Sequence, residues 1–216
     1  LLAMNQYFKG ELAWAQLLEL GAKLGADVPF CLSGGLRVGT GRGDILSEKL
    51  SSENSLALVI AKPRNLSIAT PWVYGAFDEC PEIFHLAEKL RDRYMTDTLP
   101  CDFASQSLAQ GNLAEALKAF GNDFEQVVFP HYQELKDIKQ TFIKLGAMGC
   151  HMTGSGPTIF AVTADKEAAE KLKSDFYENY CQVNEIACAT KYDPIDLWVA
   201  STIESGAQVL EVKSES

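Results

Sequence analysis

The stretch from Gly149 to Thr158 constrains the fold of this chain more than any other. It places the small residues Thr-Gly-Ser-Gly-Pro between an apolar approach and the apolar run at 159–162, a pattern typical of a tight turn between two strands. Its glycines lack a Cβ atom, so the backbone can take a positive φ and lie close to a ligand. Consecutive N–H groups beside the hydroxyls of Thr153 and Ser155 suit phosphate oxygens. The segment is therefore either a plain connection or one wall of an anion site.

Composition narrows the classes of protein to which this chain can belong. Its 216 residues, 47% of them hydrophobic, suffice for one large or two small domains with a packed core. A formal net charge of −10 disfavours a general nucleic-acid binder, which needs a basic surface, and no apolar run is long enough to cross a bilayer. The six cysteines and three histidines are scattered without a Cys-x-x-Cys pair, which disfavours a zinc site and indicates reduced thiols.

The first third of the chain predicts a helix, a hairpin and a buried strand. Apolar residues at spacings of three and four predict a helix over 11–24, which Gly25 ends. Alternating apolar and small residues predict strands joined by a tight hairpin over 30–45. The polar run 51–55 is the best candidate for a domain boundary, and the apolar run 56–61 predicts a buried strand.

The remainder of the chain predicts long helices mixed with strands. One helix is expected to begin at Thr70, as N-cap, with Pro71 at its first position. Residues 80–110 show no regular pattern. Further helices are expected after Asn112, over Leu135 to Leu145 and after Asp165, and a final strand is expected over 183–189. Adjacent strands among long helices indicate an α+β fold.

Two distant segments together resemble a known family. Gly25-Ala26-Asp27-Val28-Pro29-Phe30, followed far downstream by Met-Thr-Gly-Ser-Gly-Pro-Thr at 152–158, resembles the GHMP kinase superfamily of small-molecule kinases. Within it, the chain is most similar to the branch that acts on a cytidine-diphosphate-linked methylerythritol in non-mevalonate isoprenoid synthesis. Supporting segments stand in the same order as in that branch, at 41–44, 66–71 and 121–125.

The resemblance implies the two-domain GHMP kinase fold of class α+β, with a truncated N-terminal domain. Residues 1–50 would be the remaining tail of that domain, and 51–216 a complete ferredoxin-like C-terminal domain. The chain opens with Leu-Leu-Ala-Met, as if inside an apolar helix. The lysine–asparagine pair and the Pro-x-x-x-Gly-Leu-Gly-Gly-Gly-Ser-Ser phosphate loop of such kinases are absent from it. We therefore expect that the natural N-terminus precedes residue 1.

Four residues acquire expected roles in catalysis and substrate binding from the resemblance. Asp27 would be the base that takes the proton of the acceptor hydroxyl. Arg42 would border the cytosine through its backbone, Thr70 would lie near the substrate, and the ring of Tyr74 would stack on the base. Residue patterns alone allow plainer readings: a turn aspartate, a glycine-rich hairpin, a helix cap and a half-buried aromatic ring.

The glycine turn also gains a role by resemblance. Its residues Thr153, Gly154, Ser155 and Gly156 would form the third conserved loop of these kinases, with backbone N–H groups facing the phosphoryl group. A purely structural turn is the alternative. The neighbouring Asn122–Asp123 pair is expected to be structural, and His151 is expected to be a packed or exposed strand residue.

The resemblance thus predicts an ATP- and Mg²⁺-dependent kinase that phosphorylates the 2-hydroxyl of its cytidine-diphosphate substrate. The chain itself is expected to supply no metal site, and to bind neither nucleic acid nor membrane. A bacterial cytoplasm or a plastid stroma would suit it. Two alternatives stay open: another GHMP kinase, of the mevalonate or homoserine type, and a catalytically incomplete fragment that binds substrate only.

Overall fold

A four-stranded antiparallel sheet forms the centre of the computed structural model, which describes residues 1–50, 55–80, 100–183 and 194–209. Its strands lie in the order β4-β5-β3-β6, with bounds Gly149–Met152 (β4), Ile159–Thr163 (β5), Ala57–Pro63 (β3) and Ile195–Ser201 (β6). Alternate residues of β3 are buried, and this confirms the strand predicted over 56–61. Counted along the chain and read from the β6 edge of the sheet, the strands lie in the order fourth, first, third, second. This is the strand order of the ferredoxin-like β-α-β-β-α-β motif.

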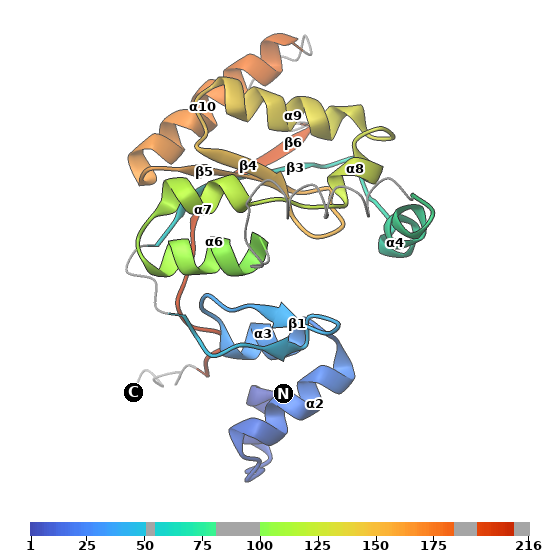
Figure 1. Ribbon diagram of the computed structural model, residues 1–216, viewed down its shortest axis with the longest axis vertical. Coiled ribbons are helices and arrows are strands. Elements are labelled where there is room, and N and C mark those ends of the chain that lie inside the picture. Colours follow the sequence, from blue (N-terminus) through green and yellow to red (C-terminus); the bar gives the residue numbers. More distant parts are fainter. Residues whose placement is uncertain (51–54, 81–99, 184–193, 210–216) are drawn as a thin grey trace, which may run out of the picture.

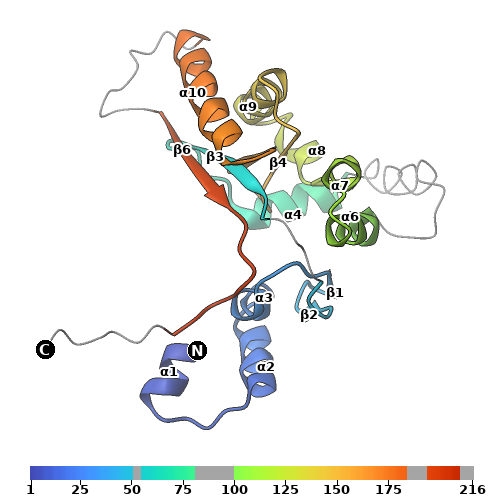
Figure 2. The ribbon, with the colours of Figure 1, turned by 90° about the vertical axis from the view of Figure 1, so that its left-hand side faces the viewer.

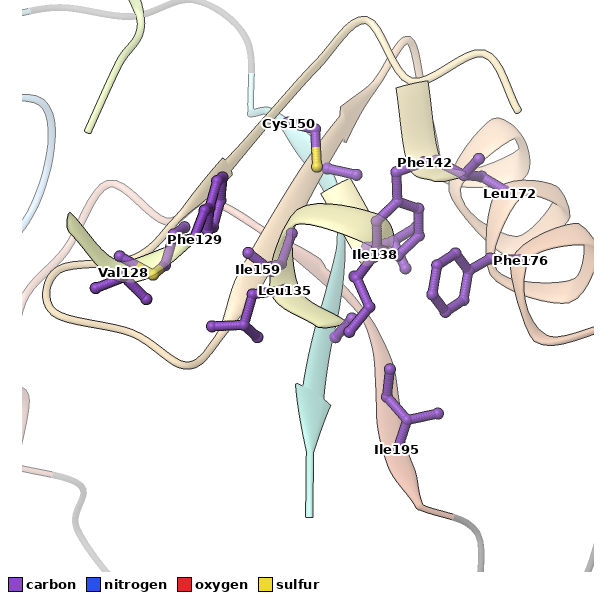
Figure 3. Packing of buried hydrophobic residues seen from close by; sticks show 14 of the residues in the cluster. Val128, Phe129, Leu135, Ile138, Phe142, Cys150, Ile159, Leu172, Phe176 and Ile195 are labelled. Carbon is purple, nitrogen blue, oxygen red and sulfur yellow. The ribbon is translucent and has the colours of Figure 1, made fainter. Parts of the chain in front are cut away.

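Two long helices cover one face of this sheet (Figures 1 and 2): α9 (Gln133–Lys144) and α10 (Lys166–Val183). The apolar stripe of α9 is fully buried, and Phe142 stacks on Phe176 of α10 with ring centroids 4.1 Å apart (Figure 3). Asp165 caps α10, because its Oδ1 accepts a hydrogen bond of 2.8 Å from the Ala168 amide. Both helices were predicted from their spacing and caps, and both are confirmed.

Among the described residues, the connection from β3 to α9 contains the shorter helices α4 (Thr70–Asp78), α6 (Pro100–Ala109), α7 (Leu113–Ala119) and α8 (Glu125–Val128). The predicted cap of α7 is confirmed, since Asn112 accepts a hydrogen bond from the Glu115 amide. The prediction of irregular structure over 80–110 is wrong for 100–109, which form α6, and residues 81–99 lie outside the described ranges. Packing of α6 against α7 supplies the stability that its weak apolar periodicity does not indicate.

Residues 1–50 form a smaller region: α1 (Leu2–Tyr7), α2 (Trp14–Leu24), α3 (Val28–Ser33) and the hairpin of β1 (Gly39–Thr40) with β2 (Ile45–Leu46). The helix predicted over 11–24 begins at Trp14 and ends at Leu24. Its C-cap is Gly25, whose φ of 176° is extended rather than left-handed. The strand predicted from residue 30 is wrong as far as Ser33, because Pro29 stands in the first turn of α3 and favours helix there.

The segment that follows β6 returns to this smaller region, as Figure 2 shows. The Ala207 amide donates to the Cys31 carbonyl at 2.8 Å, and Lys49 pairs with Glu204 at 2.7 Å. Residues 202–209 therefore tie the first 50 residues to the sheet. The strand predicted over 183–189 is not β6: Val183 ends α10, and 184–189 lie outside the described ranges, as do 51–54 of the predicted boundary.

Among the described residues, Cys31, Cys80, Cys101 and Cys150 are free cysteines. Within the described ranges, no helix is both long enough and apolar enough to cross a membrane.

Candidate active site

The glycine turn joins β4 to β5 as a closed loop. The Thr153 amide donates to the Thr158 carbonyl, and the Gly156 amide donates to the Thr153 carbonyl, both at 2.8 Å. Gly154 and Gly156 have positive φ values of 48° and 82°, as the sequence predicts for a tight turn. Among the described residues, the amides of Gly154 and Ser155 have no hydrogen-bond partner. These two N–H groups are free for an anionic ligand oxygen.

Helix α4 is joined to this turn by a pair of hydroxyl groups. The Thr70 Oγ1 and Ser155 Oγ atoms lie 2.9 Å apart and share a hydrogen bond. Thr70 was predicted as the N-cap of α4, but it is the first residue of the helix, the N-cap is Ala69, and no side chain caps it. The Thr70 hydroxyl therefore stabilises the contact between α4 and the turn instead of the helix end.

The aromatic ring of Tyr74 lies one turn further along α4. Tyr74 is 54% exposed, and its ring and that of Phe124 form an edge-to-face pair with centroids 4.8 Å apart. This contact anchors the ring while the residue stays open to solvent, where a flat ligand could stack on it.

The segment before α8 holds the turn from the other side. The Asn122 side-chain nitrogen donates to the carbonyls of Met152 and Gly154, at 2.8 and 2.7 Å. Glu125 accepts from the Met152 amide at 2.7 Å. Both polar groups of the Met152 backbone are thus bound by side chains from residues 122–125. The expectation that Asn122 is structural is consistent with these bonds, whereas Glu125 was not singled out from the sequence.

A charged cluster surrounds Glu125 behind the turn. Its Oε2 pairs with Lys139 of α9 at 2.5 Å, and its Oε1 lies 3.6 Å from His151 Nδ1. Burial acts to raise the pKa of Glu125, but hydrogen bonds from His151, Lys139 and the Met152 amide outweigh it and lower the pKa. The carboxylate therefore stays ionised at neutral pH. His151 is a half-buried residue of β4 in this cluster, consistent with the prediction of a packed or exposed strand residue.

The two remaining predicted residues lie in the region formed by 1–50. Asp27 is exposed just before α3, and its carboxylate makes no capping bond. Arg42 pairs with Asp44 at 2.7 Å on the hairpin turn, and its side chain is 74% exposed. Within the described ranges, no hydrogen bond or ion pair joins Asp27 or Arg42 to the glycine turn. The structure thus brings Thr70 into direct contact with the turn and places Tyr74 on the same helix, whereas Asp27 and Arg42 lie within residues 1–50.

No group of three or more histidine, cysteine, aspartate or glutamate side chains that could hold a metal ion occurs among the described residues. The groups that the structure gathers at the turn are therefore free amides, hydroxyls and one exposed aromatic ring. Such groups can bind an anion and a flat ring.

Comparison with known proteins gives this arrangement a context. Residues 104–181 match the family model "GHMP kinases C terminal". Two curated relatives are both named 4-diphosphocytidyl-2-C-methyl-D-erythritol kinase. The one from Gloeothece citriformis is 31% identical over 209 residues, and the match covers 97% of this chain and 63% of the relative. The one from Trichodesmium erythraeum is 33% identical over 204 residues, and the match covers 90% of this chain and 58% of the relative. The chain thus spans about three fifths of the length of these relatives.

Solved structures share the fold. A 4-(cytidine 5'-diphospho)-2C-methyl-D-erythritol kinase has a TM-score of 0.66 at 24% identity, over 95% of this chain and 62% of that one. A homoserine kinase from Cytophaga hutchinsonii has a TM-score of 0.64 at 21% identity, and the match covers 94% of this chain and 61% of that kinase. The predicted GHMP kinase fold of class α+β is confirmed.

Proposed function

We propose that this chain belongs to the GHMP kinase superfamily and acts in a kinase specific for 4-diphosphocytidyl-2-C-methyl-D-erythritol, as its match to the family model and the name of its curated relatives support. The kinase transfers the γ-phosphoryl group of ATP to the 2-hydroxyl of this substrate, a step of non-mevalonate isoprenoid synthesis. One observation supports the site above all: the Thr70–Ser155 contact of 2.9 Å holds the α4 helix of Tyr74 against the turn that carries the free amides. A cytidine base and phosphoryl oxygens can then be bound side by side.

Asp27 is the proposed general base. A kinase has to place the acceptor hydroxyl for in-line attack and to accept its proton as the new bond forms. The Asp27 carboxylate is exposed and has no ion pair among the described residues, so it is free to accept a hydrogen bond from that hydroxyl.

The glycine turn is the proposed binding element for the transferred group. The free amides of Gly154 and Ser155 donate to phosphoryl oxygens, where negative charge accumulates during transfer. Thr153 and Gly156 close the turn through their own backbone bonds.

The remaining residues are proposed to select the cytidine moiety. The exposed face of Tyr74 stacks on the cytosine, a contact that contributes about 1–3 kcal/mol. Thr70 lies beside it and fixes the turn through Ser155. Arg42 contributes through the backbone of its hairpin, because its guanidinium is already paired with Asp44.

ATP is the proposed phosphoryl donor, and Mg²⁺ its proposed counterion, because kinases use this ion to neutralise the phosphate oxygens. The free amides fit phosphate, whereas the described residues offer no ligand set for a metal ion. We further propose that residues 1–50 belong to the N-terminal domain and 51–216 to the C-terminal domain, and that the enzyme works in a bacterial cytoplasm or a plastid stroma.

The test is to measure ADP formation by the protein expressed from its complete reading frame, with ATP, Mg²⁺ and one acceptor at a time. Transfer to the cytidine substrate, with none to homoserine or mevalonate, is the expected result. Transfer to homoserine or mevalonate instead would favour the other GHMP kinases, whose fold is equally similar. Calorimetric binding of the cytidine substrate without any transfer would favour a catalytically incomplete fragment.

A further inference from the structure

Asn122 uses almost all of its hydrogen-bonding capacity on the backbone around the glycine turn. Its Nδ2 donates to the Met152 and Gly154 carbonyls at 2.8 and 2.7 Å, and its Oδ1 accepts from the Phe124 amide at 3.0 Å. Two carbonyl partners on one side and an amide partner on the other leave a single sensible assignment of the side-chain oxygen and nitrogen. The contact at Gly154 reaches directly into the part of the turn that has free amides.

The bond to the Gly154 carbonyl sets the direction of the next amide. In a trans peptide unit the C=O and N–H groups point in opposite directions. Since the Gly154 carbonyl points toward Asn122, the Ser155 N–H points away from Asn122, and it has no partner among the described residues. Gly154 itself offers little resistance to rotation of this unit, because it has no Cβ and nothing lies within 4 Å of the position that a Cβ would take.

The support beneath Asn122 is stiff. Glu125, three residues further, binds the Met152 amide at 2.7 Å and is itself held by Lys139 of α9. The Met152 side chain is 2% exposed, and its sulfur lies beneath Gly156, 2.6 Å from where a Cβ would stand. The segment 122–125 is therefore fixed to the end of β4 through both the N–H and the C=O group of Met152. Asn122 cannot move away from the turn without breaking these contacts.

We propose that Asn122 is a positioning residue that keeps the Gly154–Ser155 peptide unit in the orientation that offers the Ser155 N–H to an anionic ligand. In the opposite orientation the Gly154 carbonyl would face that ligand and repel its oxygens. The identity of the anion as a phosphoryl group rests on the proposed function, whereas the orientation of the peptide unit does not. The two can therefore be tested separately.

The first test replaces Asn122 by a group of the same shape that cannot donate. In Asn122→Asp, the carboxylate repels the Met152 and Gly154 carbonyls, and a rotated peptide unit would donate the Ser155 N–H to it. We expect hydrogen exchange of the Ser155 amide, followed by NMR, to slow by at least about tenfold, the effect of one hydrogen bond. Its proton resonance should move downfield, while the Thr153 and Gly156 amides keep their protection.

The matched control makes the same chemical change elsewhere. Asn112→Asp alters the cap of α7, where aspartate accepts the Glu115 amide as well as asparagine does. This variant should leave the Ser155 amide unchanged. Asn122→Ala removes the donors without adding charge and covers the case in which the buried carboxylate prevents folding; here the Ser155 amide should show two environments or a broadened signal.

The second test uses inorganic pyrophosphate as the probe and needs no catalysis. Pyrophosphate should shift the Ser155 amide resonance in the unmodified protein and in Asn112→Asp, and should not do so in Asn122→Asp.

In transfer assays, Asn122→Ala should lower kcat more than it raises the KM for the cytidine substrate, because a donor for the transferring group is lost. If the unmodified protein shows no transfer, the proposed function fails while the exchange result still decides the orientation. Identical Ser155 exchange and identical pyrophosphate response in all variants would overturn the proposal.

Discussion

Residues 1–50 and the sheet with its helices are stabilised very differently. In the sheet region, Phe142, Phe176 and Leu135 are fully buried in one cluster. In residues 1–50 only a few side chains, such as Leu17 and Leu32, are buried, and many large apolar side chains are exposed: Met4, Tyr7, Phe8, Leu12, Trp14, Leu20, Leu24, Phe30 and Ile45. The sheet region therefore has its own hydrophobic core, whereas residues 1–50 depend on contacts outside themselves.

This difference divides the proposed site. Thr70, Tyr74 and the glycine turn belong to the well-packed region, and direct contacts fix them there. Asp27 belongs to the weakly packed region, which the segment 202–209 ties to the sheet through backbone and charged contacts. The proposed substrate-binding half of the site therefore lies on the well-packed region, and the position of the proposed base depends on how the smaller region is held.

The largest stability difference between the two regions should appear on truncating one aromatic residue in each. Phe142→Ala removes a fully buried ring and should lower the free energy of unfolding by about 3–5 kcal/mol. Trp14→Ala removes a ring that is 47% exposed, and the loss should stay below about 1 kcal/mol. Urea denaturation measures both. Equal losses would show that residues 1–50 have a core comparable to that of the sheet.

Within the well-packed region, the two glycines of the turn should differ in their tolerance. A Cβ at Gly156 would lie 2.6 Å from the Met152 sulfur at a φ of 82°, so Gly156→Val should cost about 2–4 kcal/mol of stability. Gly154 has open space, so Gly154→Ala should cost only about 1 kcal/mol, for its positive φ. Thermal unfolding compares the pair, and a larger loss for Gly154→Ala would contradict the described packing.

A substitution of Tyr74 tests whether the well-packed region selects the cytidine moiety. Tyr74→Ala should weaken binding of the cytidine substrate by about 1–3 kcal/mol and leave ATP binding unchanged, because only the base loses its stacking partner. Tyr74→Phe keeps the ring and serves as the control with unchanged affinity. Calorimetric titration with each ligand gives both values, and a loss confined to ATP would refute the assignment.

The smallest expected effect concerns Cys150, which should not be alkylated in the folded protein. Burial, only partly offset by Lys139, raises the pKa of the Cys150 thiol to about 12, so this thiol stays protonated at pH 8. Cys31, in the smaller region, is exposed. Iodoacetamide should alkylate Cys31 in the folded protein and Cys150 only after unfolding, as peptide mass mapping can show. Early labelling of Cys150 would mean that the sheet region opens more readily than its packing indicates.

Local patterns predicted the elements that depend on local chemistry. The caps of α7 and α10, the stripe of α9 and the turn at 153–158 each follow from neighbouring residues, and all were found. Helix α6 was missed because its stability comes from packing on α7 rather than from its own pattern. Strand β6 was also missed, since its partner β3 lies more than a hundred residues earlier in the chain.

The contacts within the candidate site were harder to foresee. A family resemblance singled out Thr70 and the turn, but nothing in the sequence indicates that the Thr70 hydroxyl binds Ser155, 85 residues away. The same holds for the reach of Asn122 across 32 residues to the Gly154 carbonyl. Such bonds exist only once the sheet has placed β4 and β5 beside α4 and α8.

A double-mutant cycle on Asp27 and Asn122 tests most directly whether the two regions form one catalytic site, because Asn122→Ala disturbs the Ser155 amide whereas a substitution of the Ser155 side chain would keep it. Each variant, Asp27→Asn and Asn122→Ala, and their combination would be compared by kcat/KM for transfer to the cytidine substrate. If both residues act on the same transition state, Asp27→Asn should lower kcat/KM by at least about 10²-fold with the fold intact, and adding Asn122→Ala should change it little further. Near-normal kinetics for Asp27→Asn, or losses that simply add, would contradict a single site built from both regions.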